Sequence, residues 1–207
     1  MPMEAARVAN ATDLERLAEL ARETIAELRP TKGGDVWART AGRAEPVEDA
    51  LRAALADHDH LVVVGSVDDS VVGYGVARFN ELRDGGRLGV IGDLFVEPDF
   101  RGVGVGEAMM TLLVDWCEEQ GCFGVDSVAL PGNRPTKNFF EAFGLVARAI
   151  VVHRAFEDAV EGAPEDGEPE VGAPDDGELT GALVDGSVDD ADVEVGDEGG
   201  DDAVDAP

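Results

Sequence analysis

The order of hydrophobic and polar residues predicts that strands and helices alternate along most of the chain. Near the N-terminus, residues 5–9 predict a short strand, and Thr12 followed by Glu15 predicts a capping box that starts a helix. One face of that helix is apolar: Leu14, Leu17, Ala21, Ile25 and Leu28. The segment from Pro30 to Pro46 is broken by glycines and is predicted as a loop. A second helix fits residues 47–56.

Three apolar runs follow, over residues 61–64, 71–79 and 88–96, and the short turns between them predict an antiparallel meander. A helix over 107–120 is then predicted from one apolar stripe: Val105, Met109, Leu112, Leu113 and Trp116. The strand expected at 125–130 would lie parallel to the strand at 88–96. A helix over 135–143 and further strand residues over 146–156 complete the pattern. We therefore expect an α/β (α+β) domain with a mixed, mostly antiparallel twisted sheet flanked by helices.

The charge of the chain is concentrated at its C-terminal end. The 207 residues include 45 acidic and 16 basic ones, for a formal net charge of −29. Residues 157–207 contain 20 of the acidic residues and no Lys, Arg or aromatic residue. Such a segment cannot bury enough apolar surface to offset its chain entropy. We expect a folded domain over 4–156 and a disordered acidic tail over 157–207, which either keeps the protein solvated or recruits a partner.

Composition also limits the classes of partner that we expect for the protein and indicates its cellular environment. The cations are 14 Arg and only 2 Lys, a haloarchaeal-like balance that is typical of very salty cytoplasm, where salt screens the repulsion between acidic residues. Net negative charge disfavours nucleic-acid binding. No apolar stretch approaches 18 residues and no signal-peptide core is present, which predicts a cytoplasmic protein without a membrane partner. Cys117 and Cys122 lack the spacing of a disulfide framework or a metal site.

The most informative segment is the Gly-rich run Arg101-Gly102-Val103-Gly104-Val105-Gly106. It follows an apolar strand and leads into a helix, whose unpaired N–H groups and partial positive charge can hold a phosphate. Glycines let a ligand approach the backbone closely, and Arg101 could add a planar cationic fork. The G-x-G-x-G spacing fits neither the Walker loop nor the dinucleotide-binding fingerprint.

This pattern, R-x-x-G-x-G after a strand ending Val-x-Pro, resembles the acyl-CoA-binding segment of the GNAT superfamily of N-acyltransferases. A second signature of that family, N-x-x-A-x-x-x-Y-x-x-x-G-F, is similar to the residues downstream: Asn133, Thr136, Phe140, Gly144 and Leu145. The resemblance covers about residues 4–156. It implies that residues 101–106 cradle the pyrophosphate of coenzyme A and that N–H groups of Leu94, Phe95 and Val96 polarise its thioester.

The resemblance further implies acetyl-CoA as cosubstrate and direct attack by an amine of a small molecule or protein, with no metal. Asp93 is the first candidate for the base, because it is the only ionisable residue in an apolar strand; a structural role at a bulge is the alternative. Glu97 is the second candidate, or a solvated strand end. Gly92 stands where family members frequently carry an acid. Phe140 replaces the family's proton-donating tyrosine, and the only tyrosine, Tyr74, is on another predicted strand.

Several assignments stay open from the sequence. Asn133 either binds the pantetheine arm or caps a helix, and Phe140 either packs in the core or contacts the thioester. Arg134 and Lys137 either meet the 3′-phosphate or are solvated, and Trp37 either lines the acceptor pocket or anchors its loop. The three histidines are expected at the surface or at edges: His58, His60 and His153.

The acceptor is expected to be selected by the 30–46 loop and by residues 80–87, and a homodimer is compatible with the sequence. The competing function is a non-catalytic acyl-CoA-binding module whose acidic tail recruits a basic partner.

Overall fold

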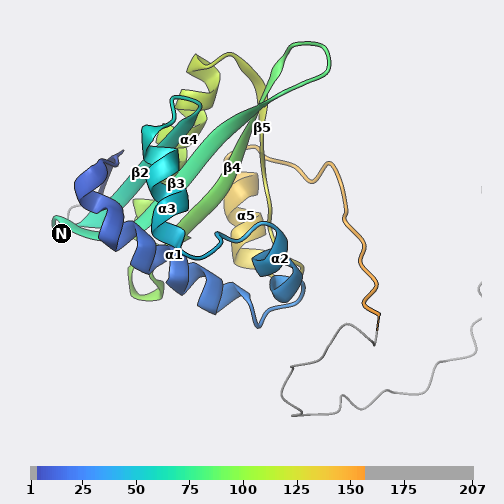
Figure 1. Cartoon of the computed structure of the whole chain (residues 1–207), viewed down its shortest axis with the longest axis horizontal. Helices are drawn as coiled ribbons and strands as arrows, with labels where there is room; N and C mark the ends of the chain where they lie inside the picture. The colour runs from blue at the N-terminus through green and yellow to red at the C-terminus, as the bar shows by residue number, and fades with distance from the viewer. Residues whose placement is uncertain (1–3, 157–207) are drawn as a thin grey trace, which may run out of the picture. The chain divides into compact units, whose positions relative to one another are not determined.

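A five-stranded sheet is the centre of the computed structural model, which describes residues 4–156 (Figure 1). The strands follow one another in sequence order across the sheet: β1 (Glu4–Val8), β2 (His60–Val67), β3 (Ser70–Glu81), β4 (Arg87–Val96) and β5 (Cys122–Ser127). Strands β1 to β4 are antiparallel neighbours, and β5 lies parallel to β4. The predicted meander, the parallel crossover and the mixed sheet are thereby confirmed.

Helices cover both faces of this sheet. Helices α1 (Leu14–Leu28) and α3 (Val47–Ala56) lie on one face, and α4 (Val105–Glu119) lies on the other (Figure 1). Because successive strand residues point to opposite faces, the sheet feeds two cores. The first holds Val62, Val64, Tyr74, Val76 and Phe95 with α1 and α3, and the second holds Val63, Ala77 and Ile91 with α4. Each fully buried side chain of this size contributes about 1.5–3 kcal/mol.

Helix α4 buries a stripe that is rotated slightly from the predicted one. Its buried residues are Val105, Met109, Met110, Leu113 and Cys117, whereas Leu112 and Trp116 are partly buried. Desolvation, with the neighbouring Cys122 thiol, raises the pKa of Cys117 to about 12. Since the thiolate is the reactive form, Cys117 is an unreactive thiol of the core.

Two predictions near the N-terminus were wrong in detail. The capping box is formed by Asn10 and Asp13 around a short 3₁₀ turn, because Asn10 accepts from Thr12 N–H at 2.9 Å and Asp13 accepts from Asn10 N–H at 2.8 Å. The predicted loop 30–46 contains a helix, α2 (Gly34–Thr40). This helix is only seven residues long, too short to show a helical pattern of apolar residues.

The prediction of strand residues over 146–156 was also wrong. Helix α5 (Arg134–Ala142) is the last regular element of the described residues, and residues 143–156 contain no strand. Ile150, Val151 and Val152 are about nine-tenths exposed, so apolar and β-branched composition alone did not produce strand pairing. A side-chain ion pair between Arg148 and Asp126 ties this segment to β5.

The acidic tail predicted over 157–207 lies outside the described residues. Within residues 4–156, no helix is long and apolar enough to cross a membrane.

Candidate active site

Strands β4 and β5 separate about halfway along β4. Their pairing ends at Ile91 and Ser127, where Ser127 Oγ donates to Ile91 O at 3.0 Å. On the other side of β4, Val76 pairs with Asp93 and the next β3 residue pairs with Ile91, which leaves Gly92 as an extra residue. Such a bulge bends its strand. From here to Val96, β4 continues without a partner on the β5 side.

The unpaired part of β4 presents main-chain donors to this gap. Glu97 N–H donates to Val72 O on β3 at 2.9 Å. Because N–H groups alternate along a strand, those of Leu94 and Val96 point the opposite way, toward the gap. Phe95 N–H points toward β3, and its side chain is buried in the α1–α3 core. Of the three residues predicted here, Leu94 and Val96 therefore supply the free amides.

The Gly-rich turn ends in a helix N-terminus with free donors. Gly102 and Gly104 have φ values of 76° and 101°, which other residues rarely adopt. The first bond of α4 runs from Ala108 N–H to Gly104 O at 2.9 Å, so the N–H groups of residues 105–107 have no intrahelical acceptor. A Cβ on Gly106 would lie 3.4 Å from the Phe139 ring. The Gly-rich turn therefore places unpaired N–H donors at the start of α4, where the sequence predicts a phosphate.

Arg101 uses part of its guanidinium for contacts within the protein. Its Nε donates to Val96 O at 2.8 Å, and its Nη2 donates to Glu27 Oε2 at 2.7 Å. Two of its donors therefore join the turn to the end of β4 and to α1. Arg101 also lines the cleft, and the remaining N–H groups of its guanidinium are not used by these two bonds.

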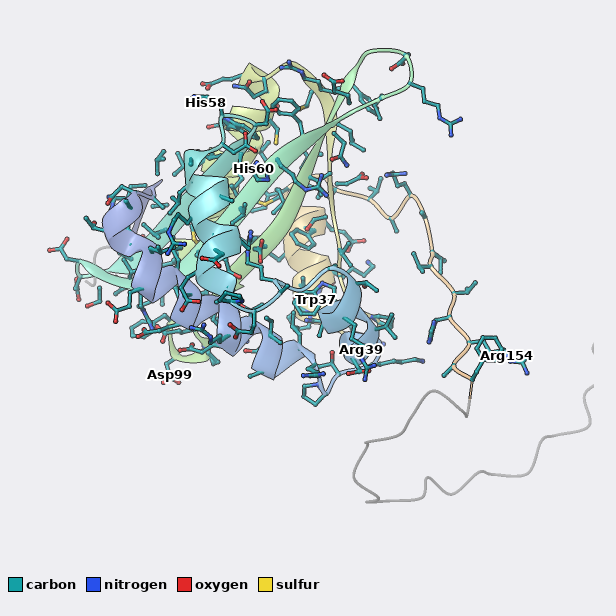
Figure 2. All side chains as sticks on the ribbon, viewed as in Figure 1. Trp37, Arg39, His58, His60, Asp99 and Arg154 are labelled. Carbon is teal, nitrogen blue, oxygen red and sulfur yellow. The ribbon has the colours of Figure 1, made fainter. Side chains whose placement is uncertain are left out.

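One cleft of about 840 Å³ connects these features, a volume typical of ligand sites. It reaches from the α4 turn through the gap beside β4 to the loop after α2. Its walls include Trp37, Arg43, His60, Arg78, Asp93, Asn133 and Phe140. Figure 2 labels Trp37 on α2 and His60 at the start of β2. Part of the 30–46 segment lines the cleft as expected, whereas residues 80–87 do not.

Asp93 is held by two neighbours within this cleft. Arg43 Nη2 donates to its Oδ2 at 2.6 Å, and Tyr74 O–H donates to its Oδ1 at 2.9 Å. The side chains of Arg43 and Asp93 are only 15% and 14% exposed. Burial, with the charge of Asp93, holds the pKa of Tyr74 well above its ordinary value, so this phenol stays protonated. Asp93 thus lies in a polar network, although its strand is otherwise apolar.

The remaining predicted residues divide between the cleft and its surroundings. Glu97 accepts from Arg16 at 2.7 Å and is not among the residues that line the cleft. Asn133 Oδ1 accepts from Thr136 N–H at 3.2 Å and also lines the cleft, so its helix-capping role is present. Phe140 is buried in the α4 core and is also among the residues that line the cleft. Lys137 forms an ion pair with Glu141.

Sequence reasoning missed three side chains of the cleft. Arg43 lies fifty residues from Asp93 in a segment predicted as loop, and no local pattern marks it. His60 was expected at a surface or an edge, yet it lines the cleft, and its Nδ1 is 3.0 Å from Asp57 Oδ2. The spacing of Asp57 and His60 was the only available signal. Arg78 follows the buried part of β3 and lines the cleft beside His60.

Comparison with known proteins identifies the family of this chain. The acetyltransferase (GNAT) family matches residues 17–145 of this chain. Glucosamine 6-phosphate N-acetyltransferase of Arabidopsis thaliana is 26% identical over 111 residues, which cover 53% of this chain and 72% of that protein. Thialysine N-epsilon-acetyltransferase of Bos taurus is 28% identical over 74 residues, 36% of this chain and 44% of that protein.

Solved structures share the fold at lower sequence identity. The aminoglycoside acetyltransferase AAC(6')-Iy, in complex with a CoA-containing bisubstrate analogue, has a TM-score of 0.58 and 19% identity, covering 75% of this chain and 99% of that one. The Arabidopsis thaliana glucosamine-6-phosphate N-acetyltransferase structure has a TM-score of 0.54 and 20% identity, with 75% and 99% coverage. The family match extends over more than half of this chain. The chain therefore belongs to the acetyltransferase (GNAT) family and is an acetyl-CoA-dependent N-acetyltransferase.

Proposed function

We propose that this enzyme transfers the acetyl group of acetyl-CoA to an amine of a small molecule or a protein by direct attack. The observation that carries the proposal is the gap between β4 and β5, which exposes free amides of β4 to the same cleft as the α4 N-terminus. The two curated relatives, whose names describe N-acetyltransferases of a phosphorylated amino sugar and of an amino acid, support an amine as the acceptor.

Each end of the cosubstrate has a matching group in the cleft. The amides of residues 102–106 would bind the pyrophosphate, because a helix N-terminus favours negative charge. Leu94 N–H, with Val96 N–H beyond it, would bind the thioester carbonyl, where a donor stabilises the charge that develops during attack. Asn133 and Phe140 would lie beside the pantetheine arm, since both line the cleft between these points. When bound, acetyl-CoA supplies the activated acetyl group.

Asp93 is our choice for the base. In the transfer, a bond forms between the amine nitrogen and the acetyl carbon while the carbon–sulfur bond breaks. Asp93 takes the amine proton directly or through water, while Arg43 and Tyr74 fix the position of its carboxylate. Glu97 stays the second choice, with Arg16 as its partner. Phe140 has no proton for the leaving sulfur, but a thiol of pKa about 8.5 leaves readily as thiolate.

The distribution of charge along the chain is the basis for two further proposals, on the role of the tail and on the salinity of the cytoplasm. We propose that residues 4–156 form the catalytic domain and that the acidic tail over 157–207 keeps the protein solvated in a salty cytoplasm. Deleting the tail should leave kcat unchanged. The melting temperature should rise from low to molar KCl, because salt screens the repulsion behind a net charge of −29. A melting temperature independent of KCl would contradict the halophilic part.

The transfer is tested by mixing the purified chain with acetyl-CoA and a panel of amines in KCl and measuring released thiol. We expect amine-dependent thiol release with formation of the acetylated amine. A chain that binds no CoA or acyl-CoA at any KCl concentration would contradict the proposal.

A second function is favoured by specific residues. Phe140 cannot donate a proton, Gly92 carries no acid, and both oxygens of Asp93 already accept hydrogen bonds. These features fit a non-catalytic acyl-CoA-binding module whose acidic tail recruits a basic partner. Tight acetyl-CoA binding without turnover on any amine of the panel would favour this function.

A further inference from the structure

Two side chains that can carry positive charge lie next to each other in the cleft, on the side of the sheet covered by α1 and α3. His60 on β2 and Arg78 on β3 are register partners in the antiparallel pair. Directly opposite residues have Cβ atoms about 5 Å apart and project from the same face. Both residues line the cleft. An anionic group of a ligand could therefore contact both at once.

The charges around this pair leave Arg78 uncompensated. The other two arginines that line the cleft are neutralised, since Arg43 pairs with Asp93 at 2.6 Å and Arg101 pairs with Glu27 at 2.7 Å. Arg78 has no salt bridge with any residue of the described range, and its hydrogen-bond partner is the amide oxygen of Asn80. In a chain with 45 acidic residues, a guanidinium without a carboxylate inside the cleft is available to an incoming anion.

His60 is oriented to act with Arg78. Its Nδ1 lies 3.0 Å from Asp57 Oδ2, which fixes the ring and leaves Nε2 outside that contact. A carboxylate partner of this kind orients an imidazole and selects which nitrogen meets a ligand. When the ring is protonated, Nε2–H can donate to an anionic oxygen beside the guanidinium of Arg78.

The distance to Asp93 sets the shape of the ligand. Asp93 is the register partner of Val76, and Arg78 lies two residues further along the same face of β3. Two residues of strand span roughly 7 Å. A single small molecule can therefore place its amine at the carboxylate of Asp93 and an anionic group at Arg78 and His60.

We propose that the acceptor is an amine that also bears an anionic oxygen group, a carboxylate or a phosphate, and that Arg78 with His60 binds that group. This inference rests on the proposed acetyl transfer. The inference adds the chemical class of the acceptor to that proposal. It also predicts that polyamines without an anionic group are poor acceptors, because Arg78 repels them.

The test compares acceptors that differ only in the anionic group. Lysine and cadaverine differ by a carboxylate, and glucosamine 6-phosphate and glucosamine differ by a phosphate, so the two pairs distinguish the two sources of negative charge. Thiol release and calorimetric binding to the CoA-saturated full-length chain are measured at the lowest KCl concentration that keeps the chain folded. We expect at least a tenfold preference, in kcat/KM or in Kd, for the anionic member of one pair.

Variants of two arginines on the same hairpin assign that preference. Arg78→Gln should abolish the preference by lowering kcat/KM for the anionic member and by relieving the repulsion of the member that carries only amines, and Arg78→Lys should retain part of the preference. Arg83→Gln is the matched control, because Arg83 is an exposed arginine in the β3–β4 turn that does not line the cleft. Arg83→Gln should leave kcat/KM unchanged for both members of each pair.

The outcomes separate the two proposals. Equal use or binding of both members, or a preference that survives Arg78→Gln, overturns the inference and leaves acetyl transfer standing. Absence of CoA binding together with absence of thiol release overturns the acetyl transfer itself.

Discussion

The two ends of the cleft are built from different parts of the protein. At the α4 end, the donors are main-chain amides of one continuous segment, residues 105–107, and of the neighbouring end of β4. At the other end, the groups are side chains from four separate elements, which meet only in the folded chain: Arg43, His60, Tyr74, Arg78 and Asp93.

This difference separates a general function from a specific one. Main-chain amides at a helix start bind any phosphate of suitable shape, and their positions depend on backbone geometry more than on side chains. Side chains at the acceptor end can change without altering the backbone. We therefore expect substitutions at the α4 end to reduce affinity for every acyl-CoA, and substitutions at the other end to change turnover or acceptor choice.

The largest expected effect is that of Asp93→Asn. Removal of a general base lowers rates by about 100- to 10,000-fold, so kcat/KM for the acceptor should fall within that range, while Kd for acetyl-CoA changes less than about threefold. Asp126→Asn is the control, because Asp126 also pairs with an arginine but lies on β5 outside the main cleft. Wild-type turnover by Asp93→Asn would exclude this residue as the base.

Gly106→Val should act at the opposite end of the cleft, beside α4. Its side chain would occupy the space beside the α4 amides, where even a Cβ lies 3.4 Å from Phe139. We expect Kd for acetyl-CoA, measured by calorimetry, to rise about 100-fold, or about 2.7 kcal/mol. Gly124→Val on β5 is the control, because a Cβ there meets nothing within 4 Å. Equal Kd values for the two variants would show that the α4 turn is not part of the acetyl-CoA binding site.

Tyr74→Phe tests the network around Asp93 through the pH dependence of stability. Burial raises the pKa of Tyr74 well above its ordinary value of about 10. The unfolded chain therefore loses this proton near pH 10 while the folded chain keeps it. The free energy of unfolding should fall as pH rises above 10, by up to about 1.4 kcal/mol per unit.

The phenylalanine variant lacks this contribution, and Tyr74 is the only tyrosine of the chain. Urea unfolding between pH 9 and pH 11 should show the difference. Identical slopes for the two proteins would mean that the phenol is not buried as described.

The smallest expected effect is that of Arg101→Gln. The ion pair of Arg101 with Glu27 is 45% and 38% exposed, and exposed pairs contribute about 0–1 kcal/mol. Kd for acetyl-CoA should therefore change less than about threefold by the same arithmetic. A tenfold loss of affinity would instead support the phosphate contact that the sequence predicted for the Arg101 guanidinium.

The same contrast explains what could be predicted from the sequence. The strand, the turn and α4 are contiguous in the sequence, so the helix start after the Gly-rich turn, where we propose that the pyrophosphate binds, could be predicted from residues 88–120. The network around Asp93 did not, because Arg43 is fifty residues away beside a helix of seven residues that shows no pattern. The strand expected over 146–156 failed for a related reason, since strand formation depends on a pairing partner that composition does not specify.

We propose that the amides between residues 101 and 107 bind a diphosphate and so place the thioester beside Leu94. Calorimetric titration of the full-length chain in molar KCl with CoA, and separately with pantetheine, which lacks the diphosphate and the nucleotide, tests it most directly. We expect CoA to bind at least 100-fold more tightly than pantetheine, and we expect Gly106→Val to remove most of this difference. Equal affinity for the two compounds, or no binding of CoA, would contradict it.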